Sequence, residues 1–369
     1  MCNVGRVTTP DTTPRRVDYS ALTATTTRAE VAAFKTAHKA GGGSWGRLAN
    51  GALVGTIFGA IAVGVFLVVM ANTFLRLSAE AVRTGEVNLV GIAFGSFFVI
   101  IAIAIVIVVV RGIGIGTWTK WMRLSRFADA NNLVFSPRDS NPSYPGSIFS
   151  RGHSRFALDH LRAKSGRFLD YGNYRYVTGS GKNQTTHNWG FLAFQLDRRL
   201  PHMVLDSTAN NGLFGGSNLG VTFTKDQRLS LEGDFDRYFT LYCPREYERD
   251  ALYVFTPDLM ALLIDEAAPF DVEIVDSWMF VYSAKPLAMV DPAVHERLLR
   301  IVDTVGTKTL TQTERYADER VGDRTANIVA PPGRRLKTGV SITTIIVVGF
   351  FIVYWGFSFF GGMFGFVGN

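Results

Sequence analysis

The sequence has few cysteines and none of the short motifs that mark common catalytic chemistry. Its two cysteines, Cys2 and Cys243, lie far apart in a chain of 369 residues. There is no paired C-x-x-C, no G-x-S-x-G and no H-E-x-x-H. These absences exclude a zinc ribbon, a nucleophile elbow and a helical zinc-protease site. We expect Cys243 to be a small buried apolar residue.

Three long stretches lack any Asp, Glu, Lys, Arg or His, namely Ala52–Leu75, Leu89–Val110 and Val340–Phe360. Each reaches the roughly 20 residues that a helix needs to cross ~30 Å of hydrocarbon. The sequence therefore predicts three transmembrane α-helices. Proton relays and ion-coupled transport require ionisable groups inside the spans, so these helices are expected to act as an anchor.

Positive charge predicts the orientation of these spans. Residues 1–50 carry seven Lys and Arg against three acids, and residues 111–126 carry four against none. Arg334, Arg335 and Lys337 precede the third run. Basic flanks stay inside, so we expect a multi-pass plasma-membrane protein with the N-terminus and main domain cytoplasmic and the C-terminus outside. Both cysteines then face a reducing compartment, and no disulfide is expected.

The net charge of +7 does not indicate nucleic-acid binding. Residues 127–333 hold 22 Lys and Arg but 26 Asp and Glu, a net charge of −4. The basic excess belongs to the flanks of the apolar runs, where it matches an inside-positive pattern. The expected partners are therefore the lipid bilayer and a protein, and nucleic acid is excluded.

The resulting domain plan has five parts, with an α+β domain of antiparallel sheet and helices at its centre. They are a disordered cytoplasmic N-terminal segment (1–50), a transmembrane helical hairpin (51–111), the cytoplasmic α+β domain (112–305), a polar linker (306–339), and the third transmembrane helix with a short outer tail (340–369).

Within the central domain, hydrophobic periodicity predicts the individual elements. Residues 117–131 have the spacing of an amphipathic helix, and from residue 168 the period changes to two. Thr256-Pro257-Asp258 and Asp291-Pro292 are typical helix starts. The predicted strands are 168–177, 189–196, 202–206, 229–232, 238–242, and a hairpin of 271–275 with 278–282 across Asp276-Ser277.

The loop YVTGSGKNQTTHNWG, residues 176–190, invites comparison with a phosphate-binding loop. That motif needs G-x-x-x-x-G-K-[ST] before a helix. Here Tyr176 stands at the first glycine position and Asn183 at the hydroxyl position. A polar hairpin loop is the better interpretation, and we expect Lys182, Asn183 and His187 to serve as interaction residues.

A second polar loop and a glycine stripe complete the predicted interaction surfaces. The loop is ANNGLFGGSNLG, residues 209–220, which presents Asn210 and Asn211. The stripe is Gly51, Gly55 and Gly59, whose four-residue spacing lets helix backbones approach each other. These features predict a protein partner or a homo-oligomer.

The run from Leu231 to Ser283 (LEGDFDRYFTLYCPREYERDALYVFTPDLMALLIDEAAPFDVEIVDSWMFVYS), together with FADANNL at residues 127–133, carries a family resemblance. It resembles an uncharacterised family of bacterial multi-span membrane proteins, best represented in high-GC Gram-positive bacteria, with a cytoplasmic domain of unknown function. The resemblance implies a bacterial plasma-membrane setting and carries over no catalytic residue.

Two groups of residues are candidates for catalysis. Asp234 and Asp236 share one face of an extended segment, and paired carboxylates can divide acid and base roles. His153 and His160 would share a face of a helix, with Asp159 beside them. Metal sites usually need three or four converging ligands, so no metal or other cofactor is expected. For the carboxylates, an acidic turn beside Arg237 is the competing interpretation.

The leading functional hypothesis is a membrane-anchored cytoplasmic module that binds a protein or small ligand without catalysis. The alternative is a membrane-anchored hydrolase that uses Asp234 with Asp236 or His153 with His160. A polar pocket around shifted carboxylate or imidazole groups would favour the hydrolase.

Overall fold

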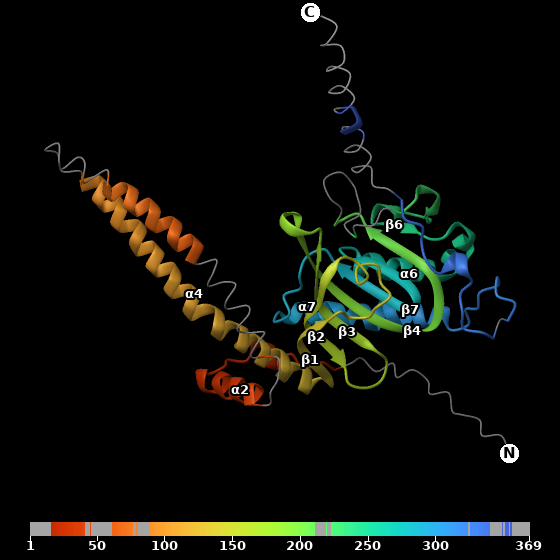
Figure 1. Ribbon diagram of the computed structural model, residues 1–369. Coiled ribbons are helices and arrows are strands. Elements are labelled where there is room, and N and C mark those ends of the chain that lie inside the picture. Colours follow the sequence, from red (N-terminus) through yellow and green to blue (C-terminus); the bar gives the residue numbers. More distant parts are fainter. Residues whose placement is uncertain are drawn as a thin grey trace, which may run out of the picture. The chain divides into compact units, whose positions relative to one another are not determined.

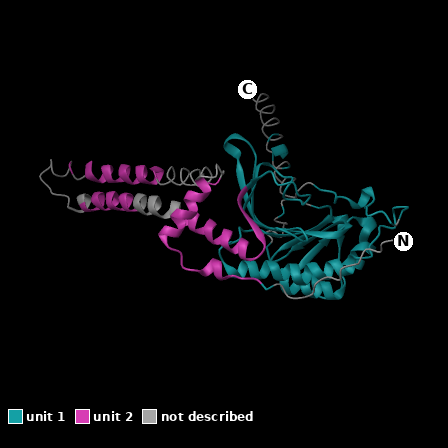
Figure 2. Cartoon of the chain, turned by 90° about the horizontal axis from the view of Figure 1, so that it is seen from below, with its two compact units in different colours: residues 1–16, 139–369 teal, residues 17–138 magenta. Residues whose placement is uncertain are grey.

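The computed structural model describes residues 16–40, 45, 61–76, 79, 89–210, 219, 223–323, 325–339, 349, 351–353 and 355. The chain divides into two compact units, residues 17–138 and residues 1–16 with 139–369 (Figure 2). The boundary falls within strand β1 (Leu133–Ser140).

The unit of residues 17–138 is helical in its described parts. It contains α1 (Ser20–Thr23), α2 (Arg28–Ala40), a helix at residues 61–76, and α4 (Leu89–Ala130). Helix α2 begins at a capping box, because the Thr27 amide donates to Glu30 (2.8 Å) and the Glu30 amide donates to the Thr27 hydroxyl (3.2 Å). An ion pair between Glu30 and Arg126 (3.0 Å) joins α2 to α4.

The predicted amphipathic helix at residues 117–131 is the C-terminal part of α4. Trp118, Trp121, Met122 and Phe127 are each at most 5% exposed there. Earlier in α4, a side chain at Gly95 would lie 2.9 Å from Leu75, so the glycine lets the helix at 61–76 approach closely.

The prediction of three transmembrane helices is wrong, because no helix in the described part of the chain is both long and apolar enough to cross a membrane. The run at 89–110 is not a separate helix, since α4 continues into the aromatic and polar segment ending at Ala130. Most of the third predicted span, 340–360, lies outside the described residues.

The predicted multi-pass plasma-membrane location is wrong for the same reason. The orientation, with cytoplasmic N-terminus and main domain and an outer C-terminus, used basic flanks of spans that the described residues do not form. The structure does contain the antiparallel sheet and helices expected at the centre of the chain.

The sheet has seven strands in the described residues, in the order β1-β2-β3-β4-β6-β5, with β7 also paired to β4 (Figure 1). Strands β2 to β7 pair antiparallel. Their bounds are β2 His153–Ala163, β3 Leu169–Thr178, β4 Thr185–Ser207, β5 Arg228–Leu229, β6 Phe239–Tyr242 and β7 Asp271–Ser283.

Both faces of the sheet are buried. One face carries an aromatic core that includes Phe149, Tyr174, Phe191 and Phe280. The opposite face packs against helices, where Tyr171 of β3 lies 3.1 Å from His295 of α7 (Pro292–Ile301). Burial on both faces explains why the strands alternate poorly between apolar and polar residues.

The described part of residues 139–369 also contains the helices α5 (Glu248–Val254), α6 (Pro257–Leu262) and α8 (Thr307–Thr313). The predicted starts at Pro257 and Pro292 are confirmed. Asp291 caps α7 by accepting from the Ala293 amide (3.0 Å). The segment expected to be a polar linker, 306–339, contains α8 and buries Tyr316 and Asp318.

Two strand predictions are corrected. Strand β7 is continuous, so the hairpin across Asp276-Ser277 is wrong; Asp276 has a φ of 52° at an irregularity in the β4–β7 register. Strand β4 likewise joins the two predicted strands 189–196 and 202–206. Asp and Ser favour turns. Here, however, β7 continues through both residues, and Asp276 remains the partner of Leu200 in β4.

Candidate functional site

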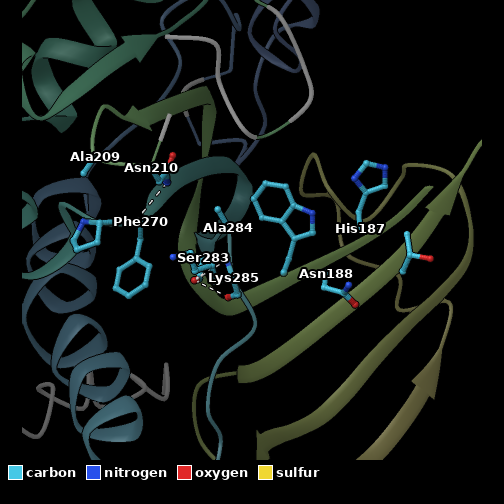
Figure 3. Close-up of a pocket in the computed structure, with 11 residues that line it drawn as sticks. His187, Asn188, Ala209, Asn210, Phe270, Ser283, Ala284 and Lys285 are labelled. Carbon is cyan, nitrogen blue, oxygen red and sulfur yellow. Dashed lines mark hydrogen bonds between the residues drawn. The ribbon is translucent and has the colours of Figure 1, made fainter. Parts of the chain in front are cut away.

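A cavity of about 730 Å³ opens beside the paired strands β4 and β7 (Figure 3). Its lining combines polar groups with two aromatic residues and one cation. The lining residues are Thr186, His187, Asn188, Trp189, Ala209, Asn210, Pro269, Phe270, Ser283, Ala284 and Lys285.

The curved β4–β7 ribbon brings both of its ends to this cavity. At one end Gly190 pairs with Ser283, and at the other Leu205 pairs with Val272. Register irregularities near Gln195 and Leu200 interrupt the ladder between them, as bulges that bend strands do. In the close-up, Asn210 and Phe270 lie on one side, His187 and Asn188 on the other, and Lys285 between them (Figure 3).

Gly190 fixes the path of the chain that follows β7. A Cβ atom at Gly190 would lie 2.5 Å from the Leu287 side chain, so only glycine allows this approach. Asn173 holds the same segment, because its side chain accepts from the Leu287 amide (2.6 Å) and donates to the Leu287 carbonyl (3.0 Å). Lys285 is thereby carried on an anchored segment at the cavity edge.

Lys285 is the only Lys or Arg among the described lining residues, and that lining contains no Asp or Glu. Its side chain is exposed and forms no ion pair within the described part of the chain. The cavity therefore presents an uncompensated positive charge beside amide, hydroxyl and imidazole groups.

His187 is a partly buried member of the lining. Its ring stacks on Tyr176 at 4.7 Å, and its Nε2 lies 2.8 Å from the Thr178 hydroxyl. Burial and the positive charge of Arg151 lower the pKa of His187, so its imidazole is neutral at pH 7. A neutral imidazole can both donate and accept a hydrogen bond toward a ligand.

Two buried carboxyl groups lie where the Asn210 end of the cavity joins the core. In the antiparallel ladder Leu205 pairs with Val272; Asp206 directly follows Leu205 and Asp271 directly precedes Val272, and the two acids are 3% and 0% exposed. Oδ1 of Asp271 accepts from the Ser207 amide (2.9 Å) and the Asn210 side chain (3.0 Å). Burial and the charge of Asp206 raise the pKa of Asp271 to about 7 despite these bonds.

A third buried carboxylate, Glu273, lies two residues after Asp271 in β7 and accepts four hydrogen bonds. It accepts from the Ser147 amide (2.7 Å), the Ser147 hydroxyl (2.6 Å), Tyr282 (2.7 Å) and His202 Nε2 (2.7 Å). The Leu336 amide donates to His202 Nδ1 (3.0 Å), which leaves the ring proton on Nε2. Burial would raise the pKa of Glu273, but these bonds lower it. The group is structural.

The structure places the predicted interaction residues in different settings. His187, which lies in β4 and not in the expected loop, and Asn210, which follows β4, line the same cavity. Lys182 and Asn183 are exposed in a 3₁₀ turn, Gly181–Asn183, and are not lining residues. Asn211, Gly51, Gly55 and Gly59 lie outside the described residues.

The carboxylate pair Asp234 and Asp236 does not form a cleft. The segment is a 3₁₀ turn, Phe235–Arg237, rather than the expected extended strand. Asp234 is exposed, and Asp236 accepts from Ser230 and from the Leu231 amide. The acidic turn weighed against the catalytic pair is the better description.

His153 and His160 lie on strand β2 and not on a helix, so the expected shared helical face is wrong. Ser154 and Asp159 have φ values of 52° and 48° at register shifts of this strand. His153 is exposed and donates from Nε2 to the Gly179 carbonyl (3.1 Å). His160 is buried, so the two imidazoles do not share a site.

His160 instead belongs to an ion cluster. Its Nδ1 lies 2.8 Å from Asp170 and its Nε2 lies 3.1 Å from Asp139. Burial alone would lower the pKa of His160, but these two carboxylates raise it to about 9. Tyr144 (2.5 Å) and Arg162 (3.0 Å) also donate to Asp170. Among the described residues, no group of three or more His, Cys, Asp or Glu side chains is arranged so that it could hold a metal ion.

Together these features define a ligand-sized polar cavity in which Lys285 is the one cation of the described lining, next to a buried polar core. Comparisons with protein-family models, with curated proteins and with solved structures find no match. The family resemblance of the sequence therefore stays a prediction.

Sequence reasoning missed Lys285, Trp189 and Phe270. Trp189 and Phe270 look like core residues in the sequence, and Lys285 follows a strand without a motif. The one usable signal was the Lys285-Pro286 step directly after a buried strand, which marks a loop at the end of the sheet.

Proposed function

We propose that this protein binds a small organic anion in the cavity beside β4 and β7. The observation that carries the proposal is the cavity itself, which brings the start of β4 (residues 186–188) and Asn210, which follows β4, together around Lys285. Its volume of about 730 Å³ lies in the range of small-molecule sites, about 300–1,000 Å³.

The lining chemistry supports an anion with both apolar and hydrogen-bonding parts. Lys285 supplies the charge, and no acid of the described lining opposes it. Trp189 and Phe270 offer apolar surface, while Asn188 and Ser283 can orient polar groups. Sites of this kind are mostly apolar, with a few placed polar groups that fix orientation.

The hydrolase alternative has less support. Asp234, Asp236, His153 and His160 are all absent from the described lining of this cavity. His160 is engaged by two carboxylates, and Asp236 by a turn. Binding is the function that the geometry favours.

The proposal is tested by calorimetric titration of the full chain with a panel of small aromatic and aliphatic carboxylates. We expect at least one to bind, and Lys285→Gln to weaken it about tenfold, which corresponds to about 1.4 kcal/mol. Lys182→Gln is the matched control, because Lys182 is exposed and outside the lining.

Equal affinity in the wild type and Lys285→Gln would overturn the proposal. An equal loss in both lysine variants would overturn it as well, since it would show general charge attraction and not this cavity. Binding by none of the panel would also contradict it.

A further inference from the structure

A second cavity, of about 500 Å³, lies between α5 and the segment that follows α8. It shares no lining residue with the first cavity. Its lining is rich in arginine and tyrosine, and consists of Arg249, Asp250, Tyr253, Arg315, Tyr316, Ala317, Glu319 and Arg320.

One wall of this cavity is fixed by internal bonds. Asp250 accepts from Tyr316 (2.8 Å) and from Arg320 (3.1 Å). The guanidinium of Arg320 also lies over the ring of Tyr247 at 3.9 Å. The charges of Asp250 and Arg320 therefore neutralise each other within the protein.

A buried carboxylate, Asp318, stabilises this wall. Asp318 is 2% exposed and accepts from Tyr247 (2.6 Å) and from the Ala330 amide (2.8 Å). Burial would raise the pKa of Asp318, but these bonds and Arg320 lower it. The carboxylate stays ionised, and the wall is pre-organised.

Arg249 and Arg315 differ from Arg320. Both are exposed lining residues, and neither forms an ion pair or a side-chain hydrogen bond within the described part of the chain. Arg320 offsets Asp250, so Glu319 is the one further acid in the described lining. The lining keeps a net positive charge of one.

Aromatic surface lies beside the two arginines. Tyr253 is 41% exposed, and the centroid of its ring lies 6.1 Å from that of Tyr316. The hydroxyl of Tyr316 is engaged by Asp250, which holds this second ring in place. Tyr253 therefore offers an open face on which a planar group can stack.

We propose that this second cavity binds a small phosphate monoester that carries an aromatic group, such as a mononucleotide. The guanidinium fork matches the geometry of phosphate oxygens and donates two parallel hydrogen bonds to them. Arg249 and Arg315 bind the phosphate, and Tyr253 stacks on the aromatic group. Asp250 and Arg320 position the wall and do not contact the ligand.

The test is titration of the full chain with adenosine monophosphate and, separately, with inorganic phosphate at low ionic strength. We expect Arg249→Gln and Arg315→Gln each to weaken nucleotide binding about tenfold, and the double variant to abolish it. Tyr253→Leu should weaken the nucleotide but leave inorganic phosphate unchanged.

Arg237→Gln is the matched control, because Arg237 is exposed and lies outside this lining. Unchanged binding in this variant and in Lys285→Gln supports the assignment to the second cavity. An equal loss with Arg237→Gln, unchanged affinity in the double variant, or no nucleotide binding by the wild type would overturn it. None of these results bears on carboxylate binding at Lys285.

Discussion

The polar groups around Glu273 and those around Lys285 lie along the same two strands, β4 and β7, but differ in burial and in hydrogen bonding. Glu273 is fully buried and accepts four hydrogen bonds from the protein. Lys285 follows the same strand, is exposed, and has no ion pair among the described residues. The first group is satisfied by the fold, and the second is left for a ligand.

This difference separates structural from functional polarity. A buried carboxylate is tolerated only when hydrogen bonds replace its water, so the Glu273 cluster contributes to folding and has no capacity left for a ligand. A charge at a cavity edge keeps its hydration and costs the fold little. Substitutions should therefore alter stability at one end of the strand and affinity at the other.

The largest expected effect is that of Glu273→Gln. An amide cannot accept from all four donors, and a buried donor is left without a partner. We expect a loss of about 3 kcal/mol in the free energy of unfolding, measured with urea at pH 7. Glu232→Gln, at an exposed position, should change it by less than about 0.5 kcal/mol.

The sign of the pH dependence sharpens this prediction. The pKa of Glu273 is lowered from its ordinary 4.5, so its contribution is present above that pH and is lost as the pH falls through the lower folded value. The difference between wild type and Glu273→Gln should shrink in acid. A constant difference across that range would contradict the assignment.

The next effect is that of His160→Gln. The pKa of His160 is raised from 6.5 to about 9, so its contribution is full below pH 6.5 and disappears as the pH rises through 9. We expect a loss of about 2 kcal/mol at pH 6 and little loss at pH 10. His153→Gln, an exposed histidine on the same strand, should lose little at either pH.

Asp271→Asn should have a smaller effect of opposite sign. The pKa of Asp271 is raised from 3.8 to about 7, so the wild type loses stability as the pH rises from 4 to 7. The neutral amide should be more stable than the wild type by about 1 kcal/mol at pH 8, with no gain at pH 4. A gain that is equal at both pH values would contradict the raised pKa.

The smallest effect concerns Cys243. Burial raises the pKa of this thiol to about 12, and its side chain is fully buried. Only the thiolate reacts with alkylating reagents, so in a Cys2→Ser background the native protein should resist iodoacetamide while the urea-unfolded chain reacts. Rapid labelling of the folded protein would show that the strand end opens.

The sequence predicted those parts of the fold that local chemistry determines. The Asp291-Pro292 start and the amphipathic segment at 117–131 follow from caps and periodicity, and both are present. The Asp276-Ser277 turn failed because a register irregularity in a long strand pair has the same composition as a turn. The apolar runs were wrong as membrane spans, since no helix in the described part of the chain is both long and apolar enough to cross a membrane.

The candidate site was predicted only in part, for a physical reason. His187 and Asn210 stand in polar stretches that sequence composition can identify, although the structure places His187 in β4 and not in a loop. Asp271 and Glu273 alternate with Val272 and Ile274, a pattern that predicts polar residues facing solvent, yet both acids are buried. Which polar residue finds partners depends on contacts between distant segments, such as Ser147 with Glu273.

The most direct test of the account is a paired measurement on Lys285→Gln, its affinity for the bound carboxylate and its free energy of unfolding without ligand. We predict about a tenfold loss of affinity with a change in unfolding free energy below about 0.5 kcal/mol. Unchanged affinity, or a loss of stability comparable with that of Glu273→Gln, would show that Lys285 belongs to the fold and not to a ligand site.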